Sequence, residues 1–155
     1  MAQKIVPHLW YNKEARQAAE FYVSVFPNSK IHNSITLHDT PSGDAGVVSF
    51  ELDGQAFMAI SAGPMFKFNE SISFMVFCKD QEEIDYYWEK LSADPKAEQC
   101  GWLKDKFGLS WQIVPKAMGE LLGKDKTGKV MQAMLKMGKI EIEKLEKAYN
   151  EAIQK

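Results

Sequence analysis

Few residues in this 155-residue chain have the types and spacing that catalytic chemistry needs. Its two cysteines, Cys78 and Cys100, form no CxxC pair and have no histidine beside them at metal-ligand spacing. This spacing argues against a structural zinc site or a redox motif. We expect both cysteines to be buried free thiols.

The serines and carboxylates do not form a recognisable catalytic arrangement either. Ser61, Ser73 and Ser110 lie outside any nucleophile-elbow motif, and no pair of carboxylates has acid/base spacing. Glu51 and Asp105 are the carboxylates nearest to the strands expected to carry a cavity, and we interpret each as a surface or turn-capping residue.

A ligand pocket is better supported by the sequence than a catalytic group. Alternation along the first strand places His8 and Trp10 on one face, and alternation along the last strand places Ser110 and Gln112 on one face, opposite Trp111. If these faces are concave, they give a cavity with a tryptophan wall, an imidazole and an amide. Apolar walls with a few fixed polar groups are typical of small-molecule sites.

Two phenylalanines, Phe66 and Phe68, follow Gly63-Pro64 in the loop between the two halves of the chain. We expect them to cover this pocket. The predicted ligand-binding residues are therefore His8, Trp10, Phe66, Phe68, Ser110 and Gln112. The alternative is that the aromatic side chains simply fill the cavity.

The first half of the chain must position the first of these residues. Residues 5–11 predict a strand, and helical spacing of apolar residues from Ala15 to Phe26 predicts a helix that ends at Pro27. Strands are expected over 30–38 and 46–61, the second divided into a hairpin by Asp53-Gly54.

The second half repeats this order. A strand over 71–79 precedes a helix with a stripe of apolar and aromatic residues, and strands over 98–105 and 109–115 follow the Asp94-Pro95 break, with a turn around Gly108. An offset of about 66 residues carries Tyr22 onto Trp88. Two tandem βαβββ modules are therefore expected.

The remaining residues predict a helical arm in two pieces, separated at Gly138. One face of the first piece is rich in methionine, which suits an irregular packing surface. This face would pack either on the sheet or on another subunit.

Composition excludes several classes of partner. The chain has 19 basic and 21 acidic residues, a formal net charge of -2, and 45% apolar residues. Neither its net charge nor the distribution of its lysine and arginine residues is typical of a nucleic-acid-binding protein. No apolar run approaches the roughly 20 residues that span a bilayer, and the N-terminus lacks a secretory core. A cytoplasmic location without membrane contact is expected.

Four segments resemble the PhnB-like proteins of the vicinal oxygen chelate superfamily, which includes glyoxalase I, bleomycin-resistance proteins and extradiol dioxygenases. These segments are WYNKEARQAAEFYVSVFPNSKI, DYYWEKLS, CGWLKDKFGLSWQIVP and VMQAMLKMGKIEIEKLEKAY. The resemblance implies an α+β fold of two tandem βαβββ modules whose curved mixed sheet surrounds a cavity. It implies one domain over 1–155, with modules at about 1–64 and 70–116 and C-terminal helices over about 117–155. It also implies a homodimer.

Metal-dependent members of that superfamily hold a divalent ion with up to four ligands, one from the first and last strand of each module. Carried onto this sequence, the first position is Val6, or His8 in a shifted register; the others are near Ala59, near Ser73 and at Gln112. His8 and Gln112 are thus the weak metal candidates. Zinc, nickel and iron sites usually need three or more protein ligands, so no metal cofactor is expected.

The PhnB-like branch also carries an old label as demethylubiquinone methyltransferases. A typical methyltransferase of that kind has a glycine-rich strand-turn-helix element, and the sequence contains no such element. We therefore expect a protein that binds an unknown small molecule without chemistry. The alternative is a metal-dependent lyase, isomerase or dioxygenase acting on a substrate with vicinal oxygens.

Overall fold

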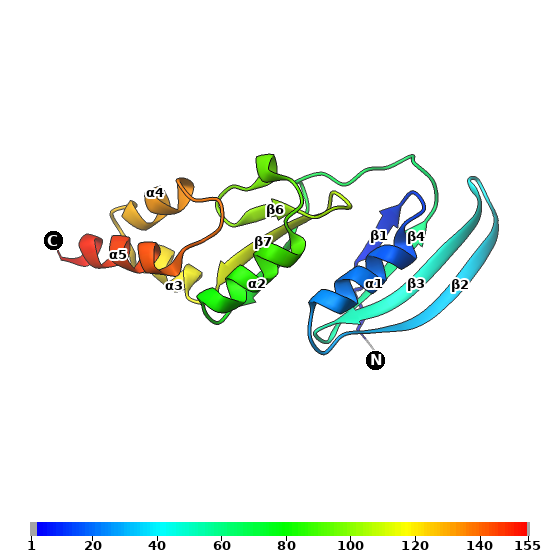
Figure 1. Cartoon of the computed structure of the whole chain (residues 1–155), viewed down its shortest axis with the longest axis horizontal. Coiled ribbons are helices and arrows are strands. Elements are labelled where there is room, and N and C mark those ends of the chain that lie inside the picture. Colours follow the sequence, from blue (N-terminus) through cyan, green and yellow to red (C-terminus); the bar gives the residue numbers. More distant parts are fainter. Residues whose placement is uncertain (1–2, 155) are drawn as a thin grey trace. The chain divides into compact units, whose positions relative to one another are not determined.

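The computed structural model describes residues 3–154, and the chain divides into two compact units between Phe68 and Asn69. Each unit has its own mixed sheet, and the second also contains the C-terminal helices (Figure 1). Within residues 3–154, no helix has the length and apolar character that crossing a membrane requires.

The first unit is a four-stranded sheet with one helix across a face (Figure 1). Its strands run in the order β1-β4-β3-β2; β1 and β4 are parallel, and the other pairs are antiparallel. Its elements are β1 (His8–Tyr11), α1 (Ala15–Val25), β2 (Lys30–Thr40), β3 (Gly43–Leu52) and β4 (Gln55–Ser61).

Alternation along β1 fixes which side chains meet α1. Leu9 and Tyr11 are buried, and the Tyr11 hydroxyl lies 3.2 Å from that of Tyr22 on α1. The hairpin between β3 and β4 is confirmed, because Asp53 and Gly54 both have positive φ, as a two-residue primed turn requires. His8 and Trp10 therefore lie on the face turned away from α1.

The second unit has a three-stranded sheet in the order β5-β7-β6. Its β5–β7 pair is parallel and its β6–β7 pair antiparallel. Its elements are β5 (Phe74–Cys78), α2 (Gln81–Leu91), the short helix η1 (Pro95–Ala97), β6 (Trp102–Lys104), β7 (Ser110–Pro115), α3 (Met118–Lys124), α4 (Lys129–Leu135) and α5 (Ile142–Ile153).

The internal repeat is confirmed, with one difference. An offset of 66 residues carries both ends of α1 onto both ends of α2, and the start of β1 onto the start of β5. The second unit, however, is βαββ among the described residues, because it has no counterpart of β2. There Asp94 accepts a hydrogen bond from the backbone of Lys96 and caps η1, whose first residue is Pro95. Proline lacks the backbone donor that a strand would need at this point.

The C-terminal arm, α3 to α5, is part of the second unit and bonds to the segment before β6 and to α2. Its break at 136–141 contains Gly138, as expected, while α3 is a further helix before the two expected pieces. Backbone amides of Cys100 and Gly101 donate to the carbonyls of Met137 and Gly138, at 2.8 and 2.9 Å. Gln81 holds the next residues by donating to the Ile140 carbonyl and accepting from the Ile142 amide.

Candidate functional site

The predicted site residues of the first unit lie around Trp10 on β1. The Trp10 indole donates to the Gly63 carbonyl at 3.0 Å, and its ring meets Phe66 edge-on, with centroids 4.9 Å apart. His8, two residues earlier on the same face, is exposed. The structure thus brings together an imidazole, an indole and a phenyl ring on the face of the sheet opposite α1.

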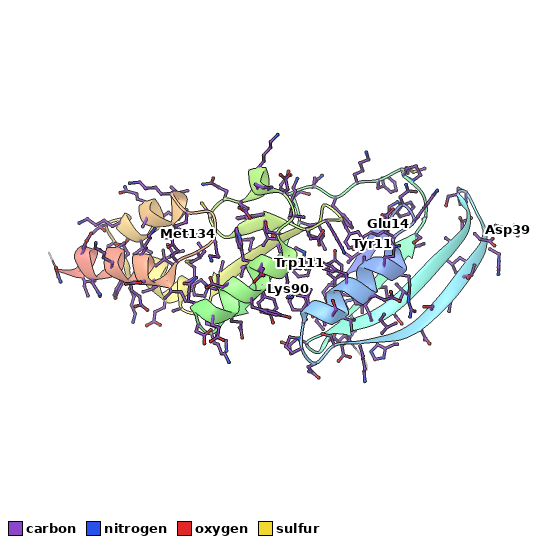
Figure 2. The ribbon with its side chains drawn as sticks, in the orientation of Figure 1. Tyr11, Glu14, Asp39, Lys90, Trp111 and Met134 are labelled. Atoms are coloured by element: carbon purple, nitrogen blue, oxygen red, sulfur yellow. The ribbon has the colours of Figure 1, made fainter. Side chains whose placement is uncertain are left out.

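Phe68 does not lie with Phe66. Its ring meets Tyr11, edge-on at 5.2 Å, and Tyr11, labelled in Figure 2, belongs to the face of β1 that α1 covers. Phe66 and Phe68 therefore contact adjacent residues of β1, Trp10 and Tyr11, whose side chains lie on opposite faces of the sheet.

The predicted residues of the second unit share a face of β7. Gln112 donates its amide to the Ser73 hydroxyl at 2.9 Å, and Ser110 is buried two residues before it. Across the β6–β7 pair, Trp102 lies opposite Gln112 and Lys104 opposite Ser110. The predicted alternation is confirmed, since Trp111 is buried on the other face, where its indole donates to Asp105.

A cavity of about 620 Å³ adjoins this face of the second unit. Its walls include Trp102 and Ser110 from the sheet, and Met131 and Met134 from α4. A cavity of this volume suits a small molecule. Of the six predicted ligand-binding residues, Ser110 is the one that lines it.

Charged side chains of both signs stand around the cavity. Lys104 pairs with Glu70, and this hydrogen bond and charge lower the pKa of the Glu70 carboxyl below its ordinary value. Asp94 and Lys96 add one further charge of each sign. The formal charge around the cavity is therefore balanced.

The residues at the expected metal positions are poor ligands. Ala59 is fully buried opposite Leu9, on the face of the sheet that α1 covers, and Ser73 is the hydrogen-bond partner of Gln112. Within residues 3–154, no three or more histidine, cysteine, aspartate or glutamate side chains come together where they could hold a metal. These residues do not fit a divalent ion with a full protein ligand set.

Two features of this region were not expected from the sequence. Asp105 has the expected turn-capping role, because it accepts hydrogen bonds from the amides of Phe107 and Leu109, but it is also buried and accepts from the Trp111 indole. The turn expected around Gly108 is confirmed, whereas the sequence did not indicate that the Asp105 side chain is buried. The second feature is the wall formed by α4, which depends on contacts distant in sequence.

Both cysteines are free and buried, as expected. Cys78 lies in β5, and Cys100 lies beside the cavity, where it is part of the backbone segment that binds the arm.

The model of the family described as 3-demethylubiquinone-9 3-methyltransferase matches residues 3–114. Among solved structures, the chain is similar to a PhnB protein from Bacillus cereus, with 31% identity, a TM-score of 0.60, and coverage of 73% of this chain and 99% of that chain. No curated protein matches it.

Two further structures share the fold at lower identity. Protein PA1353 from Pseudomonas aeruginosa has 20% identity and a TM-score of 0.57, covering 74% of this chain and 98% of that one. The genomically encoded fosfomycin resistance protein FosX from Listeria monocytogenes has 16% identity and a TM-score of 0.54, covering 80% and 99%. The matched family segment ends before α3, so the C-terminal arm lies outside it.

Proposed function

Since the chain belongs to the 3-demethylubiquinone-9 3-methyltransferase family and has the vicinal oxygen chelate fold of the PhnB-like proteins, we propose that it is a small-molecule binding protein. In the first unit, the proposed binding residues are His8, Trp10 and Phe66 on the sheet face opposite α1, with Phe68 beside Tyr11. In the second unit, they are Ser110 and Gln112 on one face of β7.

The cavity beside β7 is the observation that carries this proposal. It has apolar walls of methionine and tryptophan, and a buried hydroxyl, that of Ser110, lies among them. On the same face of β7, Gln112 presents an amide that is held by its hydrogen bond to the Ser73 hydroxyl. Apolar surface with a few held polar groups binds and orients a ligand without supplying a nucleophile or a proton donor.

Methyl transfer is not part of the proposal, although the family name mentions it. Within residues 3–154, both sheets are mixed with a single parallel pair each, and neither has the doubly wound parallel arrangement that binds a nucleotide-like cofactor at a glycine-rich turn. Membership of the family supports the fold but not an activity, because proteins of one fold carry many different functions.

The competing function is a metal-dependent enzyme in which His8 and Gln112 contribute to an ion site. The direct test is elemental analysis of the purified chain, followed by thermal unfolding with Zn²⁺, Ni²⁺, Mn²⁺ and Fe²⁺. We expect no stoichiometric metal and no ion-dependent rise in melting temperature in the wild type or in a His8→Ala, Gln112→Ala double variant.

A matched control is the double variant His38→Ala, Gln17→Ala, which removes the same side-chain types from exposed positions elsewhere in the first unit. Stoichiometric metal, with stabilisation that the first double variant loses and the control keeps, would replace the binding proposal by the enzyme. Binding itself is tested by calorimetry with a panel of small aromatic and aliphatic compounds. A panel without a single binder would contradict the proposed function.

A further inference from the structure

The Ser110 hydroxyl is an exception to the pattern of satisfied polar groups in this protein. Its side chain is 1% exposed, it lines the cavity, and its Oγ has no hydrogen-bond partner among the described residues. A buried hydroxyl without a partner is unfavourable for the folded state. A molecule in the cavity that came within hydrogen-bond distance of this hydroxyl would recover that free energy.

The C-terminal arm supplies part of the wall of the same cavity. Met131 and Met134 reach the cavity from α4, and Figure 2 labels Met134 on that helix. The helix is held in place from its C-terminal side, because the segment after it bonds to Cys100 and Gly101 and to Gln81. Gln99 adds a bond to the carbonyl of Leu135, the last residue of α4. The arm is therefore a fixed part of the cavity.

The lining indicates the kind of molecule that fits. Trp102 and the two methionine thioethers suit an aromatic ring, since sulfur and indole groups both make favourable contacts with ring faces and edges. The four charged residues around the cavity balance, two of each sign, and Lys104 is already paired with Glu70. A neutral molecule is therefore favoured over an ion.

We infer that the C-terminal arm completes, in the second unit, a site for a neutral aromatic molecule bearing a hydroxyl group that hydrogen-bonds to Ser110. This inference rests on the proposed binding function and deepens it by naming the ligand class. The site uses residues beyond the matched family segment, which ends at residue 114. Residues of the arm therefore contribute to the selectivity of the site together with residues of the sheet.

The test compares two probes that differ in one hydroxyl, 2-naphthol and naphthalene, titrated into the full chain by calorimetry. We expect one molecule of 2-naphthol per chain and weaker binding of naphthalene. Ser110→Ala should weaken 2-naphthol about tenfold, leave naphthalene unchanged and raise the melting temperature of the unliganded protein. A merely structural role for Ser110 would not separate the two probes.

The arm is tested by Met134→Gln, which should weaken both probes severalfold. Its control is Leu135→Gln, on the same helix but exposed and absent from the cavity wall. Equal binding of 2-naphthol to the wild type, Ser110→Ala and Met134→Gln would overturn the inference while leaving the binding function standing. Failure of both probes to bind the wild type would also overturn it, and the compound panel decides the binding function separately.

Discussion

Asp105 shows how one buried side chain holds the β6–β7 turn. Its Oδ1 accepts from the amides of Phe107 and Leu109, while Oδ2 accepts from the Trp111 indole at 2.9 Å. Asp105→Asn replaces one acceptor oxygen by an NH₂ group. The remaining oxygen cannot accept from both the turn amides and the Trp111 indole, so the NH₂ group faces another N–H donor. We expect it to lower the free energy of unfolding by about 1–3 kcal/mol, measured by urea denaturation.

The control is Asp53→Asn, in the hairpin of the first unit, where asparagine tolerates positive φ well. We expect a change within about 0.5 kcal/mol there. If the two variants cost the same, the acceptor role of Asp105 contributes nothing to stability.

Ionisation of the Cys78 thiol makes the free energy of unfolding depend on pH in the alkaline range. Burial, with smaller contributions from the charges of Glu83 and Asp80, raises the pKa of its thiol from the ordinary 9.0 to about 12. The folded chain therefore keeps the proton over a range in which the unfolded chain loses it. Its contribution to stability is complete below pH 9 and declines as the pH rises from 9 toward 12.

The measurement is the difference in unfolding free energy between the wild type and Cys78→Val at several pH values. We expect this difference to stay constant up to pH 9 and then to shift steadily in favour of the valine variant. A difference independent of pH from 8 to 11 would contradict the raised pKa.

The sequence predicted the elements that depend on local pattern. Apolar spacing gave α1 and α2, and Asp53-Gly54 gave the hairpin, because a turn that requires positive φ is specified by its own two residues. The missing fourth strand of the second unit could not be recognised in this way. Residues 98–101 are compatible with a strand, but the backbone amides of Cys100 and Gly101 donate to carbonyls of the arm instead.

The candidate site was predictable only in part for the same reason. Alternation correctly placed Ser110 and Gln112 on one face of β7, whereas the cavity wall from α4 depends on residues 20 or more positions away in sequence. Nor does a sequence show that one serine of several lacks a partner, since this depends on every atom packed around it.

At the level of elements, Gly101, the residue before β6, lies close to both β7 and the arm. It has φ +86°, and a Cβ there would meet the Ile113 carbonyl at 3.0 Å and the Ile140 side chain at 3.1 Å. Gly101→Ala therefore combines backbone strain with a clash. We expect a loss of about 2–4 kcal/mol in unfolding free energy and faster hydrogen exchange of the Cys100 amide, which bonds to the arm.

Gly108→Ala separates the two causes, because Gly108 has the same φ with open space around it. It should cost only about 1–2 kcal/mol, the strain of the left-handed conformation. Equal losses at the two glycines would mean that the contact with Ile113 and Ile140 relaxes freely.

At the level of the whole molecule, β5 presents a surface suited to a second copy of the chain. It is an edge strand of the second sheet, and its Met75 and Phe77 are exposed, as is the preceding Ile72. An edge strand with exposed apolar side chains is a template for association. We therefore propose that the protein is a homodimer that buries β5, and we expect light scattering to give twice the chain mass.

Phe77→Lys should convert this dimer to a monomer, because it places a charge where the two copies would exclude water. Ile153→Lys on α5 is the matched control, since Ile153 is 57% exposed and Phe77 56%. The two variants change net charge equally, so a dissociation confined to Phe77→Lys locates the interface at β5. A monomeric wild type, or a dimer that survives Phe77→Lys, would show that the exposed face of β5 serves another purpose.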